Sequence, residues 1–160
     1  MSNYAPLGDT SYIYRMEHDI DPDAHADLFI CQLSTNDASK RVEVGEVSAS
    51  DDPADFDLET VAGATEYIIH YVQDNWGCPI IFYTGTQYGN EAYGDMVDML
   101  LSLQEKYDIG IIDMYHDLST DIPLYDQYMS PDGIHPTKRG YAEWWAPFMI
   151  EQIEAMLSGN

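Results

Sequence analysis

The chain has 160 residues, of which 45% are hydrophobic, and it contains 11 Gly and 8 Pro. This size and composition fit one globular domain with a hydrophobic core, and they exclude a disordered or fibrous chain. The 6 Lys and Arg residues stand against 29 Asp and Glu residues, which gives a formal net charge of −23. Because such a charge repels phosphate backbones and anionic lipids, we exclude nucleic acids and membrane surfaces as partners.

The sequence shows neither a membrane span nor a signal peptide. Its apolar runs are strand-sized, far short of the roughly 20 residues of a span. The polar start of the chain at Met1 lacks the charged and apolar regions of a signal peptide. We therefore expect a cytoplasmic protein if Met1 is the native start.

The spacing of His and Cys residues predicts no metal site, and no cofactor is expected. The 5 His residues lack metal-binding spacing, and Cys31 and Cys78 form no C-x-x-C pair. Both cysteines lie in apolar surroundings, so we expect buried, reduced thiols rather than a disulfide.

Hydrophobic periodicity predicts the elements of the chain. Apolar residues repeat at three-to-four spacing in the predicted helices, and short continuous apolar runs mark the predicted strands. Asp9 or Thr10 is expected to cap the first helix. In chain order we expect a helix over residues 11–20, a buried strand over 27–33, a helix over 60–76, a strand over 78–83, a helix over 93–107, a strand over 109–114, and a last helix from Pro136 or Thr137 to about residue 157.

Strands that alternate with helices predict an α/β fold, namely a three-layer α/β/α sandwich with a mainly parallel sheet. The acidic stretch 40–59 shows no periodicity and is predicted to be a long surface loop. Pro147 lies inside the last helix and should kink or split it. The chain shows neither an internal repeat nor a linker, so we expect a single domain over residues 1–160.

Two polar motifs lie where open α/β sheets place their ligand sites. STND, residues 34–37, follows the first predicted strand, and DGIHP, residues 132–136, precedes the last helix. Asp132 lies three residues before His135, so its carboxylate can reach the imidazole Nδ1 and leave Nε2 as a general base. Asn36 at a strand end can donate a hydrogen bond to a developing oxyanion.

The two motifs together resemble those of the SGNH hydrolases, also called the GDSL family of esterases and lipases. LSTND (residues 33–37) is similar to the family's Gly-x-Asn-Asp block, and DGIHP to its Asp-x-x-His block. The resemblance runs from about Ser11 to the C-terminus and includes the Pro-Thr-x-x-Gly-Tyr run at 136–141. It implies a flavodoxin-like arrangement of the sheet.

The resemblance also implies a function. In a serine ester hydrolase of the esterase, lipase or acetylesterase type, His135 would be the base, Asp132 its orienting partner and Asn36 an oxyanion-hole donor. The implied substrate is a small acyl or acetyl ester, for instance of a carbohydrate or a lipid.

The nucleophile block is where the sequence departs from this family. The family's serine belongs to a Gly-Asp-Ser block after the first strand, followed by a glycine block. The nearest counterpart here is GDTS (residues 8–11), and the preceding NYAPL (residues 3–7) does not predict a central strand. The stretch from Gly8 to Asn36 is too short for the intervening strand and helices. We therefore expect an N-terminally incomplete family member without its nucleophile, in which Ser34 replaces the family's usual glycine.

Each motif also has a plain structural interpretation. DGIHP could be a capped helix start, STND a strand-end turn, and Ser11 a helix-entry residue. The rival function is a non-catalytic α/β binding or assembly domain derived from such a hydrolase. In the implied strand order a missing strand pairs beside the strand that begins at Asp27 and ends at Leu33. That edge is expected to pair with a second copy, giving a homo-oligomer, or with a completing N-terminal segment.

Overall fold

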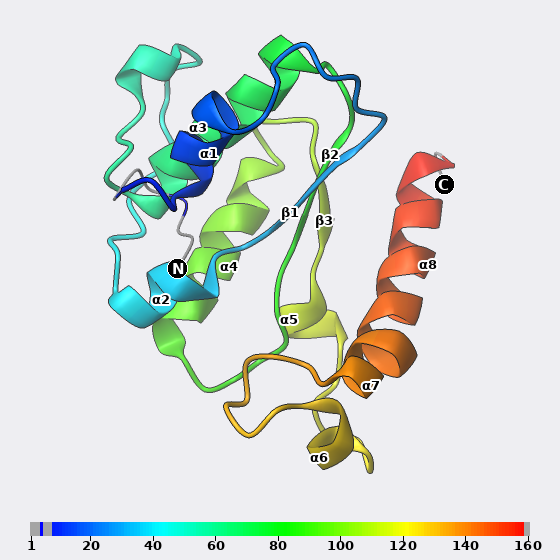
Figure 1. Ribbon diagram of the computed structural model, residues 1–160. Helices are drawn as coiled ribbons and strands as arrows, with labels where there is room; N and C mark the ends of the chain where they lie inside the picture. Colours follow the sequence, from blue (N-terminus) through cyan, green and yellow to red (C-terminus); the bar gives the residue numbers. More distant parts are fainter. Residues whose placement is uncertain (1–3, 5–7, 159–160) are drawn as a thin grey trace.

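The computed structural model describes Tyr4 and residues 8–158, and it contains a three-stranded parallel sheet (Figure 1). Phe29 pairs with Ile80, and Ile81 pairs with Gly110, so the second strand lies between the other two. The mainly parallel sheet predicted from the alternation of strands and helices is confirmed. The strands are β1 (Phe29–Gln32), β2 (Ile80–Tyr83) and β3 (Gly110–Ile112).

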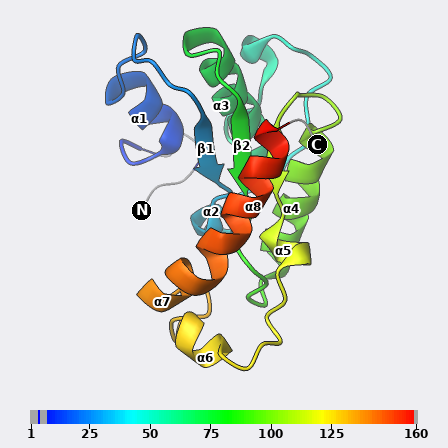
Figure 2. The same ribbon diagram turned by 90° about the vertical axis from the view of Figure 1, so that its right-hand side faces the viewer.

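Helices lie on both faces of the sheet (Figures 1 and 2). They are α1 (Tyr12–His18), α2 (Thr35–Lys40), the 3-10 helix η1 (Pro53–Asp55), α3 (Val61–Asn75), α4 (Glu91–Leu103), α5 (Met114–Asp117), α6 (Tyr125–Tyr128), α7 (Lys138–Gly140), the π-helical turn η2 (Tyr141–Trp145) and α8 (Ala146–Leu157). Successive strand residues face opposite layers, since Phe82 packs in a core with α1, α3 and α4, whereas Ile81 packs in a second core with α8. The predicted three-layer α/β/α sandwich is confirmed.

The sequence of α3 shows why this helix forms where predicted. Thr60 caps it by accepting the backbone N–H of Gly63 at 3.2 Å. Ile68 and Val72 lie one turn apart on the buried face. Gly63 is required there, because a Cβ at this position would lie 2.2 Å from the carbonyl oxygen of Asp57.

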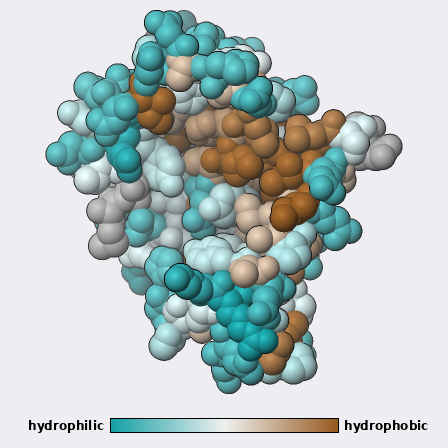
Figure 3. Space-filling model, turned by 45° about the vertical axis from the view of Figure 1, so that its right-hand side comes forward, coloured by the Kyte–Doolittle hydropathy of each residue, from teal (hydrophilic) through white to brown (hydrophobic). Residues whose placement is uncertain are grey.

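β1 is less buried than predicted, because it is an edge strand that pairs with β2 alone among the described strands. Ile30 is 41% exposed, and α8 contacts β3 at the opposite edge. Ile20 is exposed as well, as are Ile150 and Leu157 on α8. Figure 3 shows hydrophobic residues gathered on one side of the molecule, and we call this side the apolar face.

The first helix begins as predicted but uses a different cap. Ser11, rather than Asp9 or Thr10, accepts the backbone N–H of Tyr14 at 3.2 Å. Ser11 has the extended backbone typical of an N-cap and is buried at the helix entry.

The last helical region is split, as Pro147 predicts. Its cap is Thr137, which accepts the backbone N–H of Gly140 at 3.1 Å, so Pro136 lies outside the helix. The π-helical turn η2 separates α7 from α8, and it ends just before Pro147. Proline has no N–H to continue the ladder, which explains the change of helical pitch at this position.

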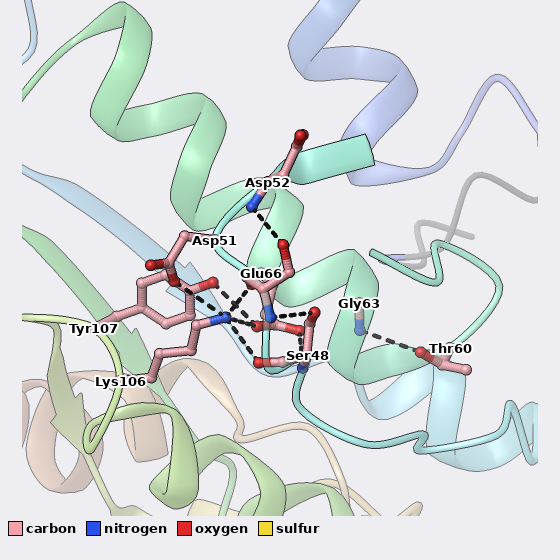
Figure 4. Close-up of polar contacts among 9 residues, drawn as sticks. Ser48, Asp51, Asp52, Thr60, Gly63, Glu66, Lys106 and Tyr107 are labelled. Carbon is pink, nitrogen blue, oxygen red and sulfur yellow. Dashed lines mark hydrogen bonds and ion pairs between the residues drawn. The ribbon is translucent and has the colours of Figure 1, made fainter. Parts of the chain in front are cut away.

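The acidic stretch 40–59 is largely irregular, as predicted, but buried contacts fasten it to the helical layer (Figure 4). Lys106 Nζ donates to the carbonyl oxygens of Ser48 at 2.9 Å and Ser50 at 2.6 Å, and to Glu66 Oε1 at 2.9 Å. The Glu66 carboxylate is fully buried and also accepts the Ser48 N–H at 2.9 Å and the Tyr107 hydroxyl at 3.0 Å. The loop is therefore held at its middle by one cation and one carboxylate.

Both cysteines are free thiols, and only one is buried. Burial raises the pKa of the Cys31 thiol to about 12. Cys78 is half-buried, contrary to the prediction, because it precedes β2 and lines an open cavity at the amino end of the strand. None of the helices in the described part of the chain is long and apolar enough to cross a membrane.

Candidate active site

Asn36 lies in the first turn of α2, directly after the carboxyl end of β1. Ser34 caps this helix by accepting the backbone N–H of Asp37 at 3.2 Å. Asn36 and Ser34 line a cavity of about 90 Å³ together with Tyr12 and Gln32. This position suits an amide that donates to a negatively charged oxygen at the carboxyl edge of the sheet.

The carboxylate of Asp37 anchors the start of α2 from the inside. Asp37 is fully buried, and its Oδ2 accepts the backbone N–H of Tyr4 at 2.8 Å. The Tyr4 hydroxyl in turn donates to the carbonyl oxygen of Gln32. Burial raises the pKa of Asp37, because it removes water from the charged carboxylate. Its Oδ1 has no hydrogen-bond partner among the described residues.

Asp132 and His135 form the hydrogen-bonded pair that their spacing predicts. Asp132 Oδ2 lies 2.8 Å from His135 Nδ1, so the tautomer with a proton on Nδ1 donates to the carboxylate and leaves the Nε2 lone pair available. Asp132 Oδ1 accepts the backbone N–H groups of His135 at 3.0 Å and Ile134 at 2.9 Å. These hydrogen bonds hold the pKa of Asp132 at about 2.

A closed turn holds this pair in place between α6 and α7. The backbone N–H of Ser130 donates to the His135 carbonyl oxygen at 2.9 Å, and Met129 and Pro136 form an antiparallel bridge. Gly133 adopts a φ of 69°, the left-handed region that glycine enters without strain. The backbone therefore fixes the distance between Asp132 and His135.

The predicted base is open to solvent. The His135 side chain is 66% exposed, and its Nε2 has no hydrogen-bond partner in the described part of the chain. The α6–α7 connection and α2 lie at the same end of the sheet, beyond the carboxyl ends of the strands (Figure 1). The elements that carry Asn36 and the Asp132–His135 pair thus lie at the same end of the sheet, and the imidazole is exposed.

Ser11, the serine of the GDTS stretch, and Ser34, which replaces the family's usual glycine, both serve as helix caps. Ser11 Oγ accepts the N–H of Tyr14, and Ser34 Oγ accepts the N–H of Asp37. Both serines are buried. The prediction that NYAPL (residues 3–7) forms no central strand falls largely outside the described residues, because only Tyr4 of this stretch is described.

The structure contains a second Asp-x-x-His pair, which the sequence predictions missed. Asp113 follows β3, and its Oδ1 accepts the backbone N–H of His116 at 3.2 Å while its Oδ2 lies 2.7 Å from His116 Nδ1. Asp132 and His135 make the same two contacts. The Asp-x-x-His spacing identifies this pair in the sequence. The pair was missed because the predicted strand over 109–114 includes Asp113, which the structure places after the strand.

Comparison with known proteins places the chain in a family. The sequence matches the GDSL-like lipase/acylhydrolase family over residues 3–143. The structure resembles that of a Bacteroides ovatus protein described as a GDSL-like lipase, with a TM-score of 0.65 and 19% identity, over 99% of this chain and 68% of that one. No curated protein matches the chain. The family match spans most of the chain and includes both polar motifs, so the chain belongs to the GDSL-like lipase/acylhydrolase family.

Proposed function

We propose that Asp132, His135 and Asn36 are the base and oxyanion-binding parts of an ester hydrolase site for small acyl or acetyl esters. Membership of the acylhydrolase family supports this general kind of activity. The observation that carries the proposal is the 2.8 Å contact between Asp132 Oδ2 and His135 Nδ1, which orients an imidazole whose Nε2 can accept a proton.

The chemistry requires a proton acceptor and a donor to the oxyanion. His135 Nε2 takes the proton of the attacking hydroxyl, and the ionised Asp132 stabilises the imidazolium that forms. The Asn36 amide donates to the carbonyl oxygen as it becomes negative. His135 then returns the proton to the leaving alcohol. The imidazole is therefore neutral again, beside an ionised Asp132, at the end of the step.

Neither Ser11 nor Ser34 presents an accessible hydroxyl to His135. Ser11 and Ser34 are buried helix caps. We propose that a polypeptide segment pairing with β1 supplies the serine. The edge of β1 that pairs with no described strand and the apolar face support this, because parallel sheets bury both faces and leave few free edges.

A second candidate function is a non-catalytic binding or assembly domain that keeps the edge of a former active site. The exposure of His135, with 66% of its side chain open to solvent, favours this alternative, because general-base sites usually exclude water around the reacting atoms.

An esterase assay with a serine-directed probe distinguishes the two functions. The purified chain is given an activated acetyl ester and a fluorophosphonate, alone and with a segment that contains the family's Gly-Asp-Ser block. We expect weak hydrolysis and no labelling by the chain alone, and labelling when the segment is added. His135→Ala should lower any hydrolysis about a hundredfold. His25→Ala is the matched control, since His25 is an exposed histidine 3.1 Å from Asp27.

The outcomes separate the proposals. Labelling of the chain alone that is lost in Ser11→Ala would make the GDTS stretch a working nucleophile block. Hydrolysis that His135→Ala and His25→Ala reduce equally would remove His135 from the mechanism. No labelling with any added segment would favour the binding domain.

A further inference from the structure

Asp113 and His116 form a more enclosed version of the pair at Asp132 and His135. The Asp113 side chain is 15% exposed, compared with 49% for Asp132. A helix cap needs one carboxylate oxygen, which Asp113 Oδ1 provides to the His116 N–H. The other oxygen holds the imidazole at 2.7 Å, which the cap does not require.

Thr84 holds Asp113 in place from the neighbouring strand. Its hydroxyl donates to Asp113 Oδ1 at 3.4 Å and accepts the backbone N–H of Tyr115 at 2.8 Å. Thr84 is fully buried at the carboxyl end of β2, and Asp113 follows β3. Two neighbouring strands therefore fix the carboxylate that orients His116, so little conformational freedom remains to be lost when a ligand binds.

His116 lines a cavity of about 300 Å³, which we call the β3 cavity. Its Nδ1 is taken by Asp113, and Nε2 has no hydrogen-bond partner in the described structure. This volume is at the lower end of the range of small-molecule sites. The polar residues that line it with His116 are Gln87, Asp117, Ser119, Thr120 and Asp121.

The lining chemistry selects the kind of ligand. An imidazole, an amide, two hydroxyls and two carboxylates are donors and acceptors for several hydroxyl groups at once. Tyr115, whose ring lies edge-to-face against His116 at 5.0 Å, adds an apolar surface to the same cavity. Asp117 and Asp121 repel anions, in a chain whose net charge is already −23.

We propose that the β3 cavity is a binding site for a neutral, hydroxyl-rich molecule of the sugar class, with His116 Nε2 accepting a hydrogen bond from a ligand hydroxyl. The site does not depend on ester hydrolysis. Asp113 is a positioning residue, because it acts on the ligand only through the imidazole.

Imidazole ¹⁵N NMR of the full chain tests the site with methyl α-glucopyranoside as the probe. We expect saturable shifts of the His116 ring nitrogens and none at His25. The glucoside should also shift the backbone amide signals of the residues that line the β3 cavity. His116→Ala keeps the backbone N–H that Asp113 Oδ1 accepts, and it should abolish these amide shifts. Asp113→Asn keeps a cap oxygen but cannot accept the Nδ1 proton in the same way, so binding should weaken about tenfold.

Glucuronate is the matched probe, because it adds only a negative charge to a similar ring. Glucuronate should have a higher Kd than the glucoside. The double variant Asp117→Asn/Asp121→Asn should bring the two Kd values closer together. The proposal is overturned if His116 and His25 respond alike to the glucoside, or if His116→Ala leaves the amide shifts unchanged. It is equally overturned if glucuronate binds as well as the glucoside to the unmodified chain.

Discussion

The fully buried carboxylate of Glu66 accepts a hydrogen bond from Lys106 Nζ at 2.9 Å, across 40 residues of sequence. Lys106→Met would leave this carboxylate buried without its cation, and we expect a loss of about 3 kcal/mol in the free energy of unfolding. Urea unfolding measures the loss. Lys138→Met removes an exposed lysine and serves as the control, with a change within about 0.5 kcal/mol. Equal effects of the two variants would show that the Glu66–Lys106 pair contributes no net stability.

The buried carboxylate of Asp37 predicts a pH dependence of stability. Burial raises its folded-state pKa above the unfolded value of about 3.9. The folded state therefore binds the proton more tightly, and the Asp37 contribution to stability falls as pH rises from about 4 through the raised pKa. Asp37→Asn has no charge to bury and should gain stability relative to the natural chain over this interval. Unfolding curves at about pH 4 and pH 7 that show no change in the difference between the two proteins would contradict this.

The unpaired edge of β1 predicts association. Ile30 is 41% exposed on a strand that pairs with β2 alone among the described strands, and such edges pair with other strands. We expect the chain to form oligomers in size-exclusion chromatography with light scattering, and Ile30→Lys to shift it to a monomer. A stable monomer whose β1 amides exchange no faster than those of β2 would show that the edge needs no partner.

The net charge of −23 predicts a stabilising effect of salt. Like charges repel one another in the compact state, and the Debye length falls to about 3 Å at 1 M salt. The Tm should therefore rise as sodium chloride is added. A Tm that stays constant or falls up to molar salt would mean that repulsion between acidic residues does not limit stability.

Local relationships in this molecule are those that the sequence predicts best. Asp132 and His135 are three residues apart, so the geometry of one turn fixes their contact whatever the remaining chain does. The alternation of strands and helices predicts the layers for a similar reason, because each amphipathic segment buries its own apolar side. The position of Asn36 follows from the end of β1.

Relationships between distant residues are those that the sequence does not reveal. Lys106 reaches Glu66 and the carbonyl oxygen of Ser48 only after α3 and α4 have packed together. The exposure of Ile30 depends on which strand lies beside β1, which no local pattern encodes. For the same reason, no local pattern reveals that the backbone N–H of Tyr4 donates to Asp37 Oδ2 across 33 positions.

The strand pairing also sets the order in which the chain can fold. β2 and β3 lie within residues 80–112 and are joined by α4, whereas β1 reaches β2 only after α2, the anchored acidic loop and α3 have been formed or spanned. Closing the longer loop costs more chain entropy before any contact is gained. The β2–α4–β3 unit is therefore the natural folding nucleus, and mutations in β1 should accelerate unfolding more than they slow refolding.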